Sequence, residues 1–398
     1  MELDRFIRKK ELVDLTRQLI QIPTENPPGD ERLAFLFVKK VLLRIGFKIK
    51  TYISPKGRWN IVATRQWGED GRTLIFNGHV DVVPAGDPHQ WTYPPFQAKI
   101  ANGRIYGRGA SDMKGGIASF LQAISLIDRS GIPLNNGTLV LHLVSDEECH
   151  GHQGMGFLSR KGVIRGDAAL VGEPTDLHPV IAQKGALWLK ISTFGKSAHG
   201  STPHLGENAI EKMTRVIEEL KSLPMEKDHP LLGKPTLSIG TIWGGTKINV
   251  VPERCEIAVD RRLLPGEKKG EVLETITRLL DSIQSHDSSF RYNIEETDFT
   301  EPTEIDAQEE IVRVSSEAIQ EVRGGRAEIK GFSGFTDGRF YIQQGKIPTL
   351  ILGPGENDQP HTTNESVEVD ALIQAAHIYG LIVLNYFGKK GEAQLRRD

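Results

Sequence analysis

The sequence predicts an α/β fold that carries an inserted α+β domain. Strand-like apolar runs alternate with amphipathic helical patterns before residue 183 and after residue 297, and this alternation favours helices layered on a sheet. Between those positions the expected order of elements is β-α-β-β-α-β, which is typical of a ferredoxin-like domain. We therefore expect a main domain made of residues 1–182 and 298–398, interrupted by a second domain at 183–297.

Each element follows from a local pattern. In the main domain, apolar residues at helical spacing predict helices at 11–22, 31–45, 117–127 and 309–322, and β-rich runs predict strands at 47–53, 60–64, 73–77 and 138–144. Pro27, Pro28 and Gly29 separate the first two helices, because these residues favour a loop. In the inserted domain we expect strands at 184–194, 236–243, 254–262 and 290–296, and helices at 207–220 and 271–283.

The composition is that of an ordinary globular protein. With 398 residues, 38% hydrophobic and 25% charged, the chain is long enough for two domains and a sizeable core. A net charge of -3 gives no reason to expect nucleic acid or an acidic membrane as a partner. Cys149 and Cys255 are too few for a disulfide framework or a thiolate metal site. The charged N-terminus resembles no secretion signal and we expect no membrane span, which favours a cytoplasmic location.

A histidine and an aspartate end the most apolar predicted strand. The run Leu74–Pro84 contains His79 and Asp81, two residues apart, so their side chains point to the same face of the strand. A carboxylate in this position suits the support of a metal-binding histidine, because it can fix the ring tautomer through the other nitrogen. Taken alone, the pair favours a simple hydrogen bond between histidine and aspartate at a strand end.

A glycine-rich stretch places a second acid before a helix. Asp112 lies within Gly103–Gly116, directly before the helical pattern at 117–127. An N-cap is the simplest role for such an aspartate. The glycines do not match the spacing of a phosphate-binding loop, so nucleotide binding is disfavoured.

Three further stretches offer metal ligands at predicted strand ends or in loops. Asp146, Glu147 and Glu148 follow one buried strand, and Glu173 follows another short apolar run. His361 lies in a loop after a third such run. Each could be a solvated loop residue, but the carboxyl ends of strands in an open α/β sheet converge on one crevice. Histidine and carboxylate ligands without thiolate suit zinc, or cobalt or manganese in its place, in a site open for catalysis.

These motifs resemble those of a family of metallo-amidohydrolases and peptidases that includes acetylornithine deacetylase, succinyl-diaminopimelate desuccinylase, aminoacylase-1 and carboxypeptidase G. The resemblance covers nearly the whole chain and is carried, in the family's order, by these segments: Gly78–Pro84, Gly107–Gly116, Asp146–Glu148, Gly172–Pro174, and His361 with Glu365. It implies a mixed-sheet, zinc-peptidase-like catalytic domain, a ferredoxin-like lid that pairs two subunits in a homodimer, and two divalent metal ions.

The resemblance also implies a role for each site residue. His79 and Glu173 would hold one metal ion, Glu148 and His361 the other, and Asp112 would bridge them. Asp81 would steady His79, and Glu147 would be the catalytic base. A cis peptide bond is expected at Asp112–Met113.

Four residues outside this centre match positions that bind substrate in the family: His199, Asn249, Arg262 and Thr336. His199 would act on the acyl oxygen from the lid, in its own subunit or in the partner's site. Asn249 could instead make only a turn, and Arg262 could be a surface strand residue. Phe332 and Phe335 are larger than the residues often found beside Thr336, which leaves the size of the substrate open.

The expected function is hydrolysis of a small N-acyl amino acid or N-acyl amine by a metal-bridging hydroxide, with Glu147 as general base and acid. The run Gly353–Gly355 before His361 favours a deacylase. A dipeptidase or carboxypeptidase of the same family is the main alternative. A non-catalytic binding protein on this scaffold is disfavoured, because every ligand and the base are present.

Overall fold

The computed structural model describes residues 3–388, which divide into two compact units. The first unit runs up to Ile181 and includes Ile305–Lys330 and the chain from Thr336 onward. The second unit consists of Ala182–Glu304 and the short segment Gly331–Phe335. From the sequence we expected the segment Gly331–Phe335 to belong to the main domain, because it lies within residues 298–398. The domain boundaries inferred from the sequence at 183 and 297 stay predictions.

The first unit alternates helices with strands, as the apolar patterns predict. Its helices are α1 (Lys9–Ile20), α2 (Arg32–Arg44), α3 (Gly115–Ser130), α4 (Met155–Arg160), α7 (Glu310–Arg323), α8 (Gly338–Phe340) and α9 (Val369–Phe387). Its strands are β1 (Lys48–Ile53), β2 (Trp59–Trp67), β3 (Arg72–His79), β4 (Lys99–Ala101), β5 (Arg104–Tyr106), β6 (Gly137–Val144), β7 (Ala168–Val171), β15 (Thr349–Ile351) and β16 (Ser366–Glu368). The chain passes between the units through β8 (Val180–Gln183), β13 (Thr303–Glu304) and β14 (Lys330–Phe332).

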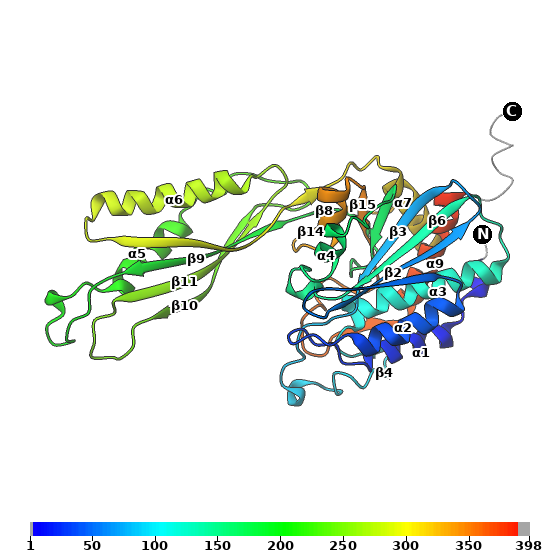
Figure 1. Ribbon diagram of the computed structural model, residues 1–398, viewed down its shortest axis with the longest axis horizontal. Coiled ribbons are helices and arrows are strands. Elements are labelled where there is room, and N and C mark those ends of the chain that lie inside the picture. The colour runs from blue at the N-terminus through cyan, green and yellow to red at the C-terminus, as the bar shows by residue number, and fades with distance from the viewer. Residues whose placement is uncertain (1–2, 389–398) are drawn as a thin grey trace. The chain divides into compact units, whose positions relative to one another are not determined.

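A large mixed sheet forms the centre of the first unit (Figure 1). Among residues 3–388 the strand order is β1-β2-β6-β3-β7-β15-β8-β13, and β14 pairs with β8. The strands β6, β3, β7 and β15 are parallel, whereas the pairs β1-β2, β2-β6 and β15-β8 are antiparallel. This arrangement confirms the predicted α/β fold with a mixed sheet.

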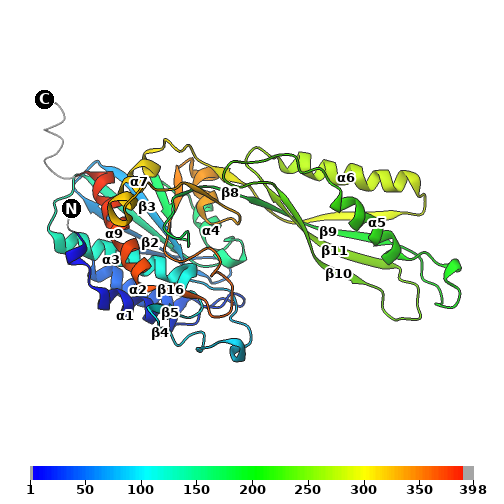
Figure 2. The same cartoon turned by 180° about the vertical axis from the view of Figure 1, so that it is seen from behind.

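Side chains on the two faces of β3 show why helices cover both sides of the sheet. Ile75 belongs to a buried cluster that includes residues of α4 and α8, such as Met155 and Phe340. The next residue, Phe76, points to the other face, where it stacks on Phe120 of α3 and meets Tyr379 of α9 edge-on. Because both faces are apolar, the strand is buried on both sides from Leu74 onward, as is usual for parallel strands. Figure 2 shows α3, α7 and α9 from behind.

The last helix corrects one expectation from the sequence. By length and composition α9 could cross a membrane, although we expected no stretch that approaches a span. Most of its residues are buried in the first unit, and Tyr379 packs against Phe76 and Phe120. We therefore interpret α9 as a core helix of the first unit. A buried core helix can match a membrane span in length and composition because it is apolar on most sides.

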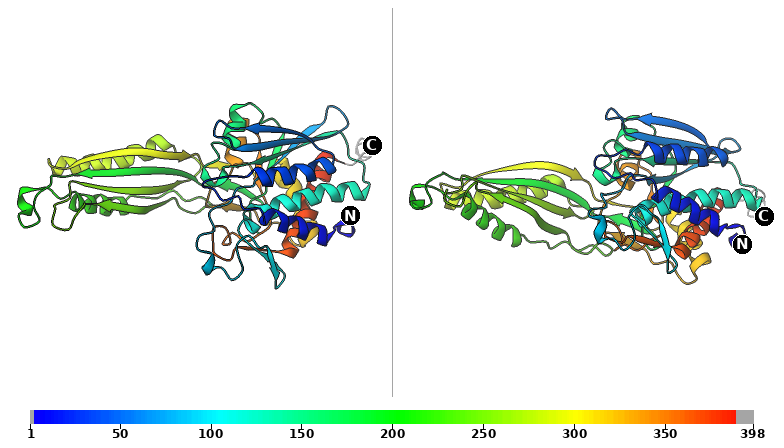
Figure 3. Two further views of the ribbon diagram at one scale, coloured as in Figure 1. Left: turned by 60° about the horizontal axis from the view of Figure 1, so that its bottom comes forward. Right: turned by 90° about the horizontal axis from the view of Figure 1, so that it is seen from below.

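The second unit is a four-stranded sheet with two helices (Figures 1 and 3). Its elements are β9 (Gly185–Phe194), α5 (Ala209–Lys221), β10 (Thr236–Gly244), β11 (Arg254–Leu263), α6 (Lys269–His286) and β12 (Arg291–Thr300). The described strands follow the order β10-β11-β9-β12, and every neighbouring pair is antiparallel. Alternate residues of β9, such as Leu187, Leu189 and Ile191, share one buried cluster with residues of α5 and α6. Both helices therefore pack on the same face, as expected for a ferredoxin-like unit.

Candidate metal centre

The predicted metal ligands gather at one edge of the central sheet. His79 is the last residue of β3, Glu148 follows β6, and Glu173 follows β7. These three strands are parallel, so their carboxyl ends meet at the same edge. His361 comes from the loop between β15 and β16, and Asp112 from the turn before α3.

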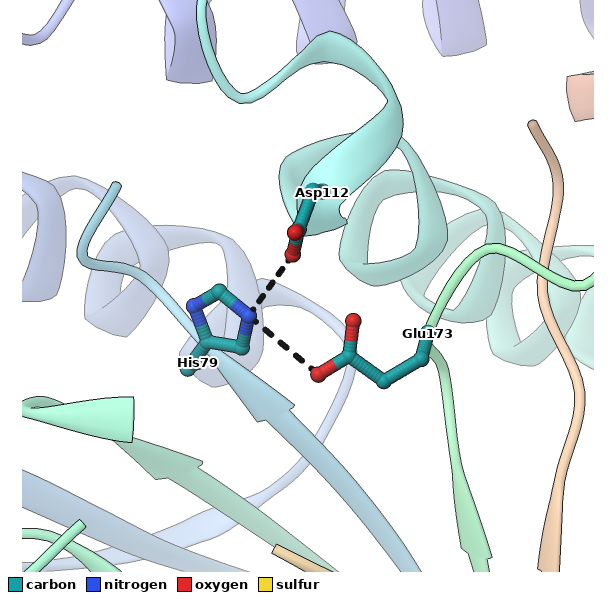
Figure 4. A group of neighbouring side chains, drawn as sticks. All are labelled: His79, Asp112 and Glu173. Carbon is teal, nitrogen blue, oxygen red and sulfur yellow. Dashed lines mark hydrogen bonds and ion pairs between the residues drawn. The ribbon is translucent and has the colours of Figure 1, made fainter. Parts of the chain in front are cut away.

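His79, Asp112 and Glu173 form the first group of ligands (Figure 4). The Nε2 atom of His79 lies 3.0 Å from Oδ1 of Asp112 and 3.3 Å from Oε1 of Glu173. All three residues are buried. Each of the three residues offers one ligand atom, and these three atoms all lie within 4.8 Å of one another.

The second group consists of Asp112, Glu148 and His361. The Nε2 atom of His361 lies 3.0 Å from Oε2 of Glu148 and 3.5 Å from Oδ2 of Asp112. Asp112 thus turns one oxygen towards His79 and the other towards His361. The two groups share this carboxylate, which is the arrangement expected of a bridging ligand.

Close packing around the turn before α3 brings Asp112 to the strand ends. A side chain at Gly116 would lie 2.3 Å from the carbonyl oxygen of Gly172, and one at Gly78 would lie 2.8 Å from Ile117. Only glycine therefore allows the start of α3 to approach β3 and β7 this closely. The Asp112–Met113 peptide bond is cis, which confirms the expectation from the sequence.

Asp81 supports His79 through its main chain, whereas its carboxylate mainly holds neighbouring groups. The Nδ1 atom of His79 lies 2.9 Å from the main-chain oxygen of Asp81, and 3.6 Å from its carboxylate. The carbonyl therefore holds the ring, which leaves Nε2 for a metal ion. The Asp81 carboxylate accepts hydrogen bonds from the main-chain N–H groups of Glu147 and Glu148, both at 3.3 Å, and from the side chain of Asn26 at 2.9 Å.

The two adjacent glutamates differ in their contacts. The Glu148 carboxylate lies 3.0 Å from Nε2 of His361 and accepts a hydrogen bond from the main chain of Val83 at 3.3 Å. Within residues 3–388, no hydrogen bond or ion pair engages the Glu147 carboxylate. Glu148 is therefore oriented as a ligand, and Glu147 has a carboxylate available for proton transfer.

Burial and mutual repulsion shift the pKa values of these groups. Burial, together with the charge of Asp112, raises the pKa of Glu148 to about 7 and that of Glu173 to about 8. Burial also raises the pKa of Glu147 well above its usual value. Hydrogen bonds to Asp112 and Glu148 raise the pKa of His361 to about 11. Burial and mutual repulsion therefore disfavour the ionised form of these neighbouring acids.

The donor set fits two divalent metal ions. Each group offers one histidine nitrogen and carboxylate oxygens without thiolate, which suits zinc and allows cobalt or manganese. Adjacent buried carboxylates repel one another unless a cation lies between them, and one ion in each group would supply that charge. The residues thus fit both the number and the kind of metal ions expected.

Two acids near the centre were given no role in the sequence analysis. Asp337 is buried, and neither of its carboxylate oxygens has a hydrogen-bond partner among the described residues. Burial raises its pKa to about 7, and its charge is one of those that raise the pKa of Glu147. Glu365 is also buried and binds the main chain of Asp112. A signal for Glu365 was its position in the same motif as His361.

The predicted substrate-binding residues of the second unit lie in two groups. The segments that carry His199 and Asn249 run side by side, because Gly200 N–H donates to the Asn249 carbonyl at 2.8 Å and Val251 N–H donates to that of Ala198 at 2.9 Å. His199 is exposed, and its Nδ1 lies 2.7 Å from the hydroxyl of Ser201.

Arg262 lies in β11, and its guanidinium already forms an ion pair. Its Nε and Nη2 atoms each lie 2.9 Å from an oxygen of Asp260, and the group lies 5.5 Å from the centre of the Phe335 ring. In the first unit, Thr336 is buried and its hydroxyl accepts a hydrogen bond from Gly338 N–H. The roles of all four residues in substrate binding stay predictions.

Comparison with known proteins identifies the family. The chain matches Peptidase family M20/M25/M40 over residues 75–385. It is 31% identical to succinyl-diaminopimelate desuccinylase of Paracoccus denitrificans, over 94% of this chain and 97% of the relative. It is 32% identical to acetylornithine deacetylase of Photorhabdus laumondii, over 91% of this chain and 94% of the relative.

Solved structures show the same fold at lower identity. An M20 family metallo-carboxypeptidase of Sulfolobus solfataricus has a TM-score of 0.78 at 20% identity, over 94% of this chain and 98% of that chain. A dinuclear metal-binding peptidase of the M20 family from Bacillus subtilis has a TM-score of 0.72 at 18% identity, over 95% of this chain and 98% of that chain. Together with the ligand groups around Asp112, the sequence match shows that the chain belongs to Peptidase family M20/M25/M40 and is a metal-dependent hydrolase.

Proposed function

We propose that this protein is a dinuclear metal-dependent deacylase that hydrolyses the amide bond of a small N-acyl amino acid or related N-acyl amine. The observation that carries the proposal is the pair of ligand groups that share Asp112, with the unengaged carboxylate of Glu147 beside them. Relatives at 31% and 32% identity, a desuccinylase and a deacetylase, support an N-acyl substrate. We propose a cytoplasmic location, as for a soluble metabolic enzyme.

In the proposed reaction, Glu147 moves the protons. Two bound cations would lower the pKa of water towards about 7 and stabilise negative charge that develops on oxygen. Glu147 takes a proton from the attacking water, whose oxygen forms a bond to the acyl carbon. As the bond between that carbon and nitrogen breaks, Glu147 delivers the proton to the leaving amine. Asp81 holds the main-chain N–H groups of Glu147 and Glu148 and thereby fixes both side chains at the strand end.

A peptidase is the second candidate. The structural neighbours include a human carnosine dipeptidase, with a TM-score of 0.76 at 17% identity over 96% of this chain and 98% of that chain. Likeness at this level of identity extends to the fold alone, so the two relatives above 30% identity favour the deacylase. A non-catalytic binding protein remains disfavoured, because such a protein would have no need of Glu147 beside a complete set of ligands.

The first prediction concerns the metal ions and the substrate class. Exhaustive chelation should abolish turnover of at least one member of a panel of N-acetyl, N-succinyl and N-formyl amino acids and dipeptides, and zinc or cobalt should restore it. Elemental analysis should find two metal ions per chain in the active protein. Full activity after chelation, with no metal found, would refute a metal-dependent mechanism, and exclusive turnover of dipeptides would select the peptidase.

The second prediction separates the two glutamates. Glu147→Gln should retain both metal ions but lower kcat by about 10²–10⁴-fold, because it removes proton transfer alone. Glu148→Gln should instead lose metal, because it removes a ligand of the second group. If Glu147→Gln releases metal while Glu148→Gln keeps it, the two roles are reversed.

The third prediction concerns specificity at Arg262. We propose that its guanidinium binds the substrate's α-carboxylate, with Asp260 holding the group in position. Wild type should then hydrolyse N-acyl amino acids better than their carboxamides, and Arg262→Lys should reduce this difference. The comparison is kcat/KM for each matched pair of substrates. Equal values for acid and carboxamide in the wild type would exclude this role.

We further propose a homodimer formed by the second unit. Its strand β10 is one of the two edges of the four-stranded sheet, and Ile242 and Trp243 on this strand are 52% and 64% exposed. An exposed apolar edge strand favours pairing with another chain, and a second copy would cover it by a twofold contact. In such a dimer His199 would serve the active site of the partner subunit, where it could stabilise charge on the acyl oxygen.

The fourth prediction follows from this exchange of His199. Neither Glu147→Ala nor His199→Ala should be active alone. A mixture under subunit exchange should recover about a quarter of wild-type activity, because random pairing makes half the dimers mixed and each of these has one intact site. Light scattering must first demonstrate dimers. Absence of recovery in proven mixed dimers would mean that His199 acts within its own chain.

A further inference from the structure

A buried acid links the two segments that carry Asp112 and His361. Glu365 lies four residues after His361, and its side chain is 1% exposed. One carboxylate oxygen accepts hydrogen bonds from the main-chain N–H groups of Ser111 at 2.8 Å and Asp112 at 3.0 Å. The other oxygen accepts from Gly109 N–H at 3.1 Å and from Arg108 at 2.7 Å. Four donors thus fix this carboxylate. Through the main-chain N–H of Asp112, the carboxylate holds the turn before α3 at the predicted metal ligand.

Arg108 extends the link to the residue that directly follows His361. Its Nη1 atom donates to the Thr362 carbonyl at 3.1 Å, as well as to Glu365. The guanidinium also lies 5.2 Å from the centre of the buried Trp91 ring. The buried guanidinium of Arg108 therefore holds both Thr362, which directly follows His361, and Glu365.

This anchoring matters because the His361 side chain is itself poorly packed. It is 57% exposed, whereas the side chains of His79 and Glu148 are 1% and 5% exposed. Apart from its contacts with Glu148 and Asp112, the His361 ring therefore has little packing to fix its position. The held main chain on its C-terminal side has to do so, through Thr362 and Glu365.

We propose that Glu365 is a positioning residue of the metal centre: with Arg108, it locks the Asp112 turn to the His361 loop so that the second group of ligands is assembled before metal binds. The proposal rests on the proposed function in requiring that two metal ions bind. It assigns Glu365 neither contact with metal nor a part in proton transfer. Its effect is on the affinity of the second ion, through the relative position of Asp112 and His361.

Glu365→Gln tests this link with little change of shape. The glutamine amide keeps one oxygen, which can accept from two of the four donors. Its NH₂ group then faces the other two donors, either Arg108 and Gly109 or the N–H groups of Ser111 and Asp112, and cannot accept hydrogen bonds from them. Loss of a residue that orients metal ligands typically lowers metal affinity by about 10–100-fold. We expect a loss of this size for the second ion, with a smaller effect on the first.

The fifth prediction is measured by titrating metal-free protein with Co²⁺. Wild type should bind two ions, and Glu365→Gln should bind the second one about 10–100-fold more weakly, with a changed visible absorption spectrum. Glu368→Gln is the matched control: Glu368 lies three residues away on β16, its side chain is 55% exposed, and it pairs with Arg104 instead of the Asp112 turn. This control should behave as wild type.

The outcomes separate the possible failures. Equal affinity and equal spectra for wild type and Glu365→Gln would overturn the positioning role while leaving the proposed function intact. A wild type that binds no Co²⁺ would overturn both. Circular dichroism of the metal-free proteins checks folding; if Glu365→Gln does not fold, Arg108→Lys tests the same link, because it keeps the charge but removes the Nη1 group that donates to both Glu365 and Thr362 and replaces it with a shorter side chain. Unweakened binding of the second ion by Arg108→Lys would then count against the proposal.

Discussion

One carboxylate, that of Asp112, has to face two histidines at once. Its Oδ1 lies 3.0 Å from His79 and its Oδ2 lies 3.5 Å from His361. Each of the other ligands belongs to one group only, so the position of Asp112 sets the spacing of the whole centre. Because the site is buried and rich in acids, water screens its charges poorly, and cations in both groups would lower the electrostatic cost. The surrounding structure meets this constraint by holding Asp112 from several sides.

The central sheet and its helices supply that support. Because β3, β6 and β7 are parallel, their carboxyl ends bring His79, Glu148 and Glu173 to one edge of the sheet. Apolar residues on both faces of β3 then fix the sheet between two layers of helices, and Phe76 anchors it to α3 and α9. The glycines Gly78 and Gly116 allow α3 to begin directly beside the strand ends. The same packing that forms the core therefore delivers Asp112 to its ligand partners.

The convergence of the ligands could be predicted because strand ends are visible in the sequence as apolar runs that stop at His79, Asp146 or Glu173. The contacts between side chains could not be predicted in the same way. The sequence suggested that the Asp81 carboxylate holds His79, but the nearest atom is its main-chain oxygen, since the carboxylate is turned towards the N–H groups after β6. Apolar patterns record burial along one element, whereas these contacts depend on how two elements meet.

The metal ligands and the proposed substrate-binding residues belong largely to different units of the chain. Every metal ligand and the proposed base come from the first unit, whereas His199, Asn249 and Arg262 come from the second. The first set is constrained by burial and by shared hydrogen bonds, so a substitution in it disturbs several ligands together. The second set lies on exposed or half-buried segments, where a substitution leaves the metal ligands in place. Under the proposed roles of His199, Asn249 and Arg262, a substitution in the second unit would alter substrate preference while the metal ligands around Asp112 keep their arrangement.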